Sequence, residues 1–420
     1  MRGLLTLATS FALALPWPAS AAPAARITLG PYVQDVQKDG FTVAYETDAP
    51  AEGVVVAGGA RVVTHGTRHE AEVRGLAAGT RYPYQVRVGG ALEASGEVAT
   101  FSTGGTLRFD VFGDTRDDSI GHALAAKLVS DAPDLLIGTG DLVHRGSDEA
   151  AWSAFFSSEE PILRSVPLYP AAGNHELYGD EEGAHYRRYF VLPEDGRDRR
   201  YYSFVAGPAR FIALDGNAIT PSLDDPQTRW LERTLKKSAQ AGERHVFVFL
   251  HQPPFSTGGH CGAAPAEAAW VALFERYRVR AVFAGHDHAY ERLERNGIHY
   301  FVSGGGGAPL YPERPSCPAY DRAAQRRYLP VHHYLRVRVS GDEVEVAAIP
   351  IEGGAPLEVT RFSAGEKLDA GLAPPLVDDR LIKSRLARAA IDTTRRRWPM
   401  VLALLLLLVG AASLLSRRRR

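Results

Sequence analysis

Short polar clusters made of metal-binding residue types follow one another along the chain. They are Gly113-Asp114, Gly140-Asp141 with His144 just beyond it, Gly173-Asn174-His175-Glu176, His251-Gln252-Pro253 and Gly285-His286-Asp287-His288. Carboxylate and amide oxygens bind hard cations, and imidazole suits zinc and iron. Brought together, such groups would hold a pair of metal ions, so the clusters predict a dinuclear metal site.

The elements that must position these clusters are indicated by apolar runs that directly precede them, at 107–112, 135–137, 166–169, 246–250 and 281–284. Short runs closed by glycine or proline are typical of buried strands. Since open α/β sheets bind ligands at the carboxyl ends of their strands, we expect the clusters to meet at one edge.

Helical patterns separate the apolar runs, at about 120–130, 149–156, 227–239 and 266–277. Strand–helix alternation predicts a layered α/β fold. Residues 201–215 and 334–349 alternate as antiparallel hairpins, the second turning at Ser340-Gly341-Asp342. The predicted sheet is therefore mixed.

The order aspartate, Gly-Asp, Gly-Asn-His-Glu, histidine and Gly-His-x-His resembles the calcineurin-like metallophosphoesterases. The Gly-Asn-His-Glu block and a β-domain upstream resemble, more narrowly, the purple acid phosphatase branch. The resemblance covers residues 26 to 350 or so. It implies an α/β fold, an αββα sandwich of two sheets, preceded by an all-β fibronectin III-like sandwich. It also implies metal-dependent hydrolysis of phosphate esters.

The resemblance assigns each cluster a place at two metal ions, which would be iron, zinc or manganese. The resemblance implies that Asp114 and His288 bind the first metal and that Asp141 bridges the two. The second metal would be bound by Asn174, His251 and His286. The reaction it implies is attack on phosphorus by a hydroxide that bridges the metals.

One position departs from the family pattern. Purple acid phosphatases have tyrosine three residues after the second aspartate, where this chain has His144. Other branches have histidine two residues after the first aspartate, where this chain has Arg116. We expect His144 to replace the missing ligand; the alternative is a histidine that only neighbours the site. Without the tyrosinate, an all-divalent centre without purple colour is expected.

Four residues are candidates for catalysis beside the metals. His175 resembles the family residue that protonates the leaving oxygen, and Glu176 is expected to orient its ring and raise its pKa. His260 follows His251 closely, where plant members carry substrate-contacting histidines, and its alternative is a plain loop residue. Arg116 is suited to binding phosphate oxygens through its guanidinium, or else to a surface salt bridge.

Upstream of these clusters, residues 26–103 alternate as short strands between glycine and proline clusters, which predicts a β-sandwich. Residues 76–84 resemble the E–F corner of fibronectin type III domains. The segment has no catalytic cluster, and its two histidines, His65 and His69, are expected on an exposed strand.

The two ends of the chain have the composition of targeting segments. Residues 1–22 contain Arg2, an apolar run and Ala19-Ser20-Ala21, which predicts a secretory signal, with an N-terminal anchor as the alternative. Residues 398–416 are apolar and flanked by arginines, which predicts a transmembrane helix. A catalytic domain at 104–362, a basic spacer at 363–397 and a basic tail at 417–420 complete the organisation.

These segments together predict an exported protein in the cell membrane, with the catalytic domain on the extracytoplasmic side. The alternative is a tail that a sorting enzyme removes. Cys261 and Cys317 are the two cysteines, and they either form a disulfide or stay free thiols. The net charge of −1 gives no field that would attract nucleic acid.

The expected substrate is a small phosphate monoester. A phosphodiesterase or nucleotide hydrolase is the near alternative, and a surface binding protein with a vestigial metal site is the alternative from another class. The complete ligand set argues against the last. Substrate specificity is expected to depend on the loops 179–200 and 256–265, whose sequences do not point to a particular substrate. The sequence also indicates no oligomeric state.

Overall fold

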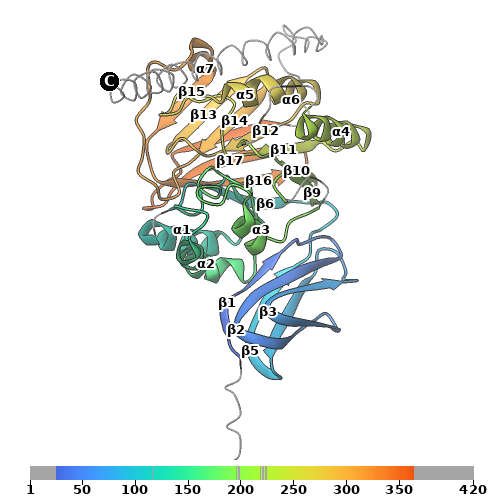
Figure 1. The fold of residues 1–420 in the computed structure, drawn as a ribbon. Coiled ribbons are helices and arrows are strands. Elements are labelled where there is room, and N and C mark those ends of the chain that lie inside the picture. Colours follow the sequence, from blue (N-terminus) through green and yellow to red (C-terminus); the bar gives the residue numbers. More distant parts are fainter. Residues whose placement is uncertain are drawn as a thin grey trace, which may run out of the picture.

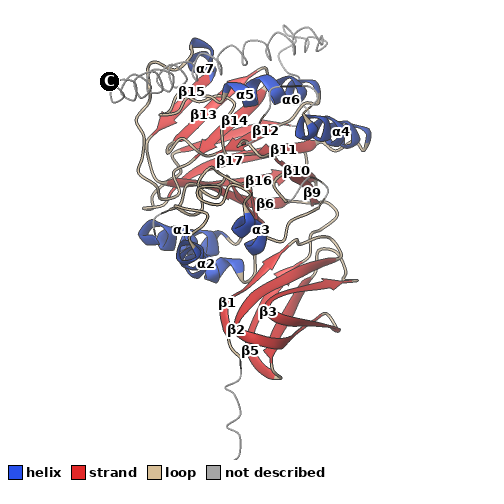
Figure 2. Ribbon diagram, in the orientation of Figure 1, coloured by secondary structure: helices blue, strands red, loops and turns tan. Residues whose placement is uncertain are grey.

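The computed structural model describes residues 25–363 except 117, 195, 197–198, 218, 220–221 and 223–224. Its strands form a five-stranded, a seven-stranded and a six-stranded sheet. The five-stranded sheet makes up a separate lobe near the N-terminus, and the other two sheets lie against each other with helices on their outer faces (Figures 1 and 2). The N-terminal lobe is therefore all-β and the remainder is α/β, as the sequence predicts.

The five-stranded sheet is built around two long strands that share a register shift. Its strands are β1 (Ile27–Gln34), β2 (Gly40–Ala57), β3 (Ala60–Arg74), β4 (Arg81–Val88) and β5 (Ala91–Ala99). The first part of β2 pairs with β1 and its last part pairs with β4, and the β2–β3 register shifts between Glu46 and Ala51. Phe41, Val55 and Val86 are fully buried in the core of this lobe.

His69 lies in this lobe and corrects one expectation, since it is fully buried rather than exposed. Its ring stacks on Tyr45 with centroids 4.5 Å apart, and its Nδ1 lies 2.8 Å from the Thr64 hydroxyl. The alternating pattern of β3 continues past the register shift, but the bend turns His69 into the core. His65, before the shift, is exposed as expected.

The six-stranded sheet has the strand order β18-β17-β16-β6-β7-β8 and carries the first half of the site. β6, β7 and β8 are parallel, and β16, β17 and β18 are antiparallel. The bounds are β6 (Leu107–Phe112), β7 (Leu135–Gly138), β8 (Leu168–Pro170), β16 (His333–Ser340), β17 (Glu343–Pro350) and β18 (Glu358–Ser363).

The seven-stranded sheet has the order β15-β13-β14-β12-β11-β10-β9 and carries the second half. β10, β11, β12 and β14 are parallel, which makes this sheet mixed as well. The bounds are β9 (Tyr202–Ala206), β10 (Ala209–Ala213), β11 (His245–Phe249), β12 (Ala281–Ala284), β13 (Tyr290–Arg295), β14 (Ile298–Ser303) and β15 (Gln325–Leu329).

An aromatic core joins the two sheets. The ring of Phe109 in β6 lies 5.0 Å from Phe211, 5.5 Å from Phe247 and 5.9 Å from Phe283, all in the opposite sheet. These side chains alternate inward from buried strands, so the sheets are fixed face to face. The parallel strands of both sheets therefore end close together, and their carboxyl ends form a common edge.

The helices cover the outer faces of the two sheets (Figure 1). Their bounds are α1 (Asp118–Asp131), α2 (Glu149–Leu163), α3 (Ala184–Tyr189), α4 (Pro226–Gln240), α5 (Ala264–Ala266), the π-helical turn η1 (Glu267–Val271), α6 (Ala272–Arg276) and α7 (Ala319–Ala324). α2 runs seven residues past its expected end at 156, through Pro161.

Within the described part of the chain, no helix is long and apolar enough to span a membrane. The predicted signal at 1–22, the transmembrane helix at 398–416, the tail at 417–420 and almost all of the spacer lie outside the described residues.

Candidate metal centre

Each polar cluster follows a parallel strand at the common edge of the two sheets. Asp114 follows β6, Asp141 follows β7 and Asn174 follows β8, while His251 and His286 follow β11 and β12 in the other sheet. The His286 amide donates to Oδ2 of Asp114 at 3.0 Å, which joins the two sheets across the site. The edge predicted from sequence is thus assembled from both sheets.

The backbone at these strand ends is strained in a way that gathers the side chains. Asp114, Asp141 and His286 have φ values of 56°, 54° and 72°, a region that residues other than glycine rarely adopt. Glycine precedes the last of them because a Cβ at Gly285 would lie 2.5 Å from Oδ2 of Asp114. The loops therefore approach one another more closely than side chains at these glycines would allow.

Three residues form the centre of the site. Asp114, Asp141 and His251 are buried, and the ligand atoms that they offer all lie within 4.8 Å of one another. Nε2 of His251 is 3.3 Å from Oδ1 of Asp141, and Nε2 of His288 is 3.3 Å from Oδ1 of Asp114. Oδ1 of Asp114 is buried and accepts no hydrogen bond from any described residue. A buried carboxylate oxygen without a donor fits a bound cation.

The histidine tautomers also fit metal binding. Nδ1 of His251 donates to the Thr139 carbonyl at 2.8 Å, and Nδ1 of His288 donates to the Pro309 carbonyl at 2.6 Å. Each bond holds the proton on Nδ1 and turns the bare Nε2 toward the carboxylates. Metal-binding histidines are oriented by bonds of this kind.

Asn174 and His286 complete the other side of the centre. Oδ1 of Asn174 lies 3.1 Å from Nε2 of His251, and Nδ1 of His286 lies 3.2 Å from the same atom. The structure therefore brings together most of the predicted ligands, namely Asp114, Asp141, Asn174, His251, His286 and His288.

Arg116 lies inside the site rather than in a surface salt bridge. Its side chain is only 12% exposed, and its Nη2 is 3.8 Å from Asp114 and 3.6 Å from Asp141. Nη1 donates to Nε2 of His175 at 2.7 Å, and Nη2 contacts Nε2 of His288. A guanidinium at this place carries positive charge beside both carboxylates.

His175 projects into the same space, but its ring is not oriented by Glu176 as expected. Nδ1 of His175 donates to the His144 carbonyl at 2.6 Å, and Nε2 is 3.9 Å from Asp141. Burial lowers the pKa of His175, although Asp141 opposes the shift. The expected increase through Glu176 is therefore not what the structure shows.

Glu176 instead ties together the two loops that carry ligands. Its buried carboxylate accepts hydrogen bonds from the amides of Asp141 at 2.8 Å, Leu142 at 2.7 Å and Gly173 at 2.6 Å. Both oxygens are occupied by backbone donors from neighbouring loops, so the residue positions Asp141 rather than the His175 ring.

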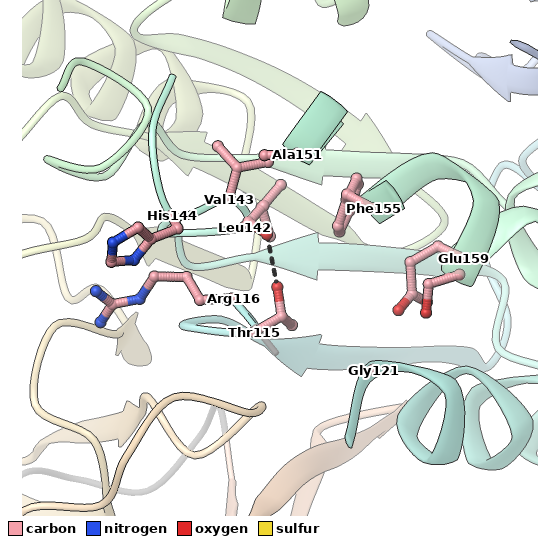
Figure 3. Close-up of a pocket in the computed structure, with 10 residues that line it drawn as sticks. Thr115, Arg116, Gly121, Leu142, Val143, His144, Ala151, Phe155 and Glu159 are labelled. Atoms are coloured by element: carbon pink, nitrogen blue, oxygen red, sulfur yellow. Dashed lines mark hydrogen bonds between the residues drawn. The ribbon is translucent and has the colours of Figure 1, made fainter. Parts of the chain in front are cut away.

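His144 lies beside Arg116 at the mouth of the site. Figure 3 shows the two side chains next to each other, on loops that a hydrogen bond from Thr115 to the Leu142 carbonyl holds together at 2.9 Å. His144 is exposed, its ring centroid is 5.3 Å from that of His175, and the mutually close ligand atoms do not include its nitrogens. Its role as a ligand stays a prediction.

His260 lies at the opposite rim and is anchored there. Its amide and Nδ1 lie 2.8 and 3.0 Å from Oδ1 of the buried Asp287, and its ring stacks on His286 at 4.1 Å. The hydrogen bond to Asp287 raises the pKa of His260. The next residue, Cys261, forms a disulfide with Cys317, so the paired-cysteine alternative is correct.

Tyr311 is a residue of the site that the sequence did not reveal. Its ring stacks on His288 with centroids 4.1 Å apart and lies 5.3 Å from His260, and its amide donates to the His288 carbonyl at 3.0 Å. It belongs to a segment with no periodic pattern, and nothing in the sequence indicates that it would be near the metals.

Similarity to known proteins agrees with this geometry. Residues 107–290 match the model of the calcineurin-like phosphoesterase family. An uncharacterized protein of Mycobacterium tuberculosis is 30% identical over 268 residues, which are 53% of this chain and 50% of that protein. Purple acid phosphatase 22 of Arabidopsis thaliana is 27% identical over 278 residues, 60% of this chain and 62% of that one. The chain thus spans half to under two thirds of the length of these relatives.

The fold has a counterpart among solved structures. The purple acid phosphatase PPD1 from yellow lupin seeds superposes with a TM-score of 0.71 at 18% identity, covering 79% of this chain and 74% of that one. A structure of PhoD superposes with a TM-score of 0.61 at 12% identity, and the match covers 89% of this chain and 100% of that one. Residues 107–290 are therefore similar to the calcineurin-like phosphoesterases, and the fold is that of the purple acid phosphatases.

Proposed function

We propose that the protein is a metal-dependent hydrolase of phosphate monoesters. The observation that carries the proposal is the convergence of oxygen and nitrogen ligands from both sheets on Asp141, whose carboxylate lies within 4 Å of His251, His175 and Arg116. A carboxylate so placed is suited to bridge two cations. A pair of bound ions would supply activated water and positive charge for the phosphoryl oxygens.

The side chains around the ligands divide the remaining work. Arg116 directs its two terminal nitrogens into the site, where a guanidinium is suited to bind a phosphoryl group at two oxygens. Nε2 of His175 faces the site, since Nδ1 donates to the His144 carbonyl. It would carry the proton for the leaving oxygen once a bound phosphoryl group draws away Nη1 of Arg116, from which Nε2 accepts in this structure. Proton delivery matters most for a poorly activated leaving group, which supports monoesters as substrates.

The test combines metal analysis with an ester panel on the purified full-length chain. We expect two metal ions per chain and faster hydrolysis of monoesters, such as nitrophenyl phosphate and glycerol phosphate, than of bis-nitrophenyl phosphate. Faster cleavage of the diester or of nucleoside triphosphates would favour the alternative activities. A metal-loaded protein that cleaves none of these would contradict the proposal and favour a binding protein.

We also propose that the enzyme is exported and tethered to the membrane with its catalytic part outside. The support is compositional: the charged and apolar layout of 1–22, the apolar segment 398–416 between arginine clusters, and a fibronectin type III-like lobe ahead of the enzyme. In that lobe the Tyr82 hydroxyl accepts the Ala77 amide at 2.9 Å, a bond expected of the E–F corner.

Deleting Trp398–Arg420 tests the tether. The described site residues all lie before 321, so the truncated chain should be released from the membrane with unchanged activity. Fractionation of cells expressing both chains measures this. Full-length protein found soluble with its tail intact would refute the anchor, and soluble protein lacking the tail would indicate processing.

A further inference from the structure

Tyr178 exposes an aromatic ring at the edge of the metal site. The side chain is 52% exposed, whereas most tyrosines of the described chain are buried or half-buried. Its ring meets the ring of His175 nearly edge-on, with centroids 6.4 Å apart and planes at 69°. An exposed aromatic ring in contact with the proposed proton donor is placed to touch substrate.

Arg145 covers one face of this ring. Its guanidinium carbon lies 4.1 Å from the Tyr178 ring centroid, within the range of a cation–π contact. Arg145 is itself exposed, and within the described ranges no carboxylate lies at salt-bridge distance from it. Arg188, by contrast, is paired with both Glu46 and Glu149. The Arg145 charge is thus left available to a ligand.

The loops that carry the pair are locked to the loop of His175. The His175 carbonyl accepts the amides of Gly146 at 2.7 Å and of Tyr178 at 3.2 Å. A Cβ at Gly179 would lie 2.5 Å from the Ser147 hydroxyl, so the two loops are also in close contact further on. The backbone segments that carry Tyr178 and Arg145 are therefore held next to that of His175.

We propose that Tyr178 and Arg145 form a platform for the leaving group and select aryl esters, above all those with a second negative charge. The inference rests on the proposed function, in which His175 protonates the leaving oxygen. The leaving group must then extend past His175, where Tyr178 offers an aromatic surface and Arg145 an unpaired cation. The substrate class is an aryl phosphate with an anionic substituent.

The aromatic half of the platform is tested with two substrates, phenyl phosphate and ethyl phosphate. In Tyr178→Ala the ratio of kcat/KM for the aryl over the alkyl ester should fall about two- to tenfold from the wild-type ratio. Tyr178→Phe should keep the ratio, because the ring remains. Tyr320→Ala removes another exposed tyrosine, 39% exposed in α7, and should also leave the ratio unchanged.

The charged half is tested with 4-carboxyphenyl phosphate and phenyl phosphate. Arg145→Ala should lower the preference for the carboxylated ester about two- to fivefold, and the effect should shrink at high salt. The matched control is Arg276→Ala. Its guanidinium also lies over a tyrosine ring, 5.4 Å from the centroid of Tyr277. This pair precedes β12, so it lies at the amino end of that strand, whereas the site lies at the carboxyl end.

Binding of phenylphosphonate and ethylphosphonate to the metal-loaded chain, measured by calorimetry, separates this inference from the proposed function. If no ester is hydrolysed, the proposed function is wrong, yet tighter binding of the phenyl compound that Tyr178→Ala abolishes would still support the platform. Equal losses for aryl and alkyl ligands in Tyr178→Ala, or no loss for either, would overturn it.

Discussion

The two halves of the metal centre are not equally complete. On the side predicted to hold the second metal, Oδ1 of Asn174 and Nδ1 of His286 lie 3.1 and 3.2 Å from Nε2 of His251. On the first-metal side, Asp114 and His288 face the Arg116 guanidinium, and the next candidate ligand, His144, is exposed. We therefore expect the second-metal side to bind its ion tightly and the first-metal side to bind its ion weakly, because the Arg116 charge repels a cation there.

The cause of the difference lies in two substitutions relative to the family pattern. Neither the tyrosine expected at 144 nor a histidine at 116 is present. An arginine cannot give up its charge in a protein, so Arg116 opposes a cation beside it unless its side chain moves or an anion lies between them. A bound phosphate ester would be such an anion, so it should strengthen binding of the ion on the first-metal side.

Removing the shared carboxylate should have the largest effect. Asp141→Ala takes away the residue that neighbours both sides, so both ions should be lost and hydrolysis should fall more than about 10³-fold. Elemental analysis and an activity assay measure this. Retention of one ion in Asp141→Ala would show that one half assembles without a bridge.

Removing the proposed proton donor should have the next largest effect and leave both halves intact. His175→Ala should keep metal and fold but slow hydrolysis about 10²- to 10⁴-fold, most for alkyl phosphates, whose leaving oxygens need a proton. Equal slowing of alkyl and nitrophenyl esters would instead assign His175 to substrate binding. Circular dichroism and metal content serve as controls.

Much of this arrangement follows from the sequence alone. β6 and β12 have the bounds that their apolar runs predict, and the six ligands meet because parallel strands must end at a common edge. The packing of loops could not be predicted in the same way. Tyr311 reaches His288 from a segment without periodicity, held by long-range contacts such as the Cys261–Cys317 disulfide.

Two other errors have the same origin in tertiary structure. His69 has the alternation of a surface strand, but the bend of the sheet buries it. Glu176 is adjacent to His175 in sequence, yet its carboxylate turns toward backbone amides of a neighbouring loop. Local pattern defines which strand a residue belongs to, whereas the partner of a polar side chain depends on which loops meet.

The unequal halves predict stepwise loss of metal. Titrating a chelator such as dipicolinate into the full-length protein should remove one ion at about ten- to a hundredfold lower concentration than the other. His288→Ala should abolish the weak ion only, and His251→Ala the tight one. Adding phosphate should raise the chelator concentration needed for the weak ion. Simultaneous release of both ions would remove the distinction between the halves.

The smallest effect concerns His144, at the open end of the first-metal side. If its ring binds the first metal, His144→Ala should weaken binding of only the more easily removed ion, by about tenfold, because three other groups remain.

The colour of the iron-loaded protein is a second test of His144. Phenolate is the group that gives ferric purple acid phosphatases their colour, so the ferric form of this protein should lack the visible band, and His144→Tyr should introduce it. Absorption spectra of the iron-loaded proteins measure this. Because the backbone carbonyl of His144, not its ring, accepts the hydrogen bond from Nδ1 of His175, a side-chain substitution should leave proton transfer unchanged. A coloured wild-type protein would mean that another tyrosine reaches the iron and completes the first-metal side. Tyr311 is the candidate, because its ring stacks on His288.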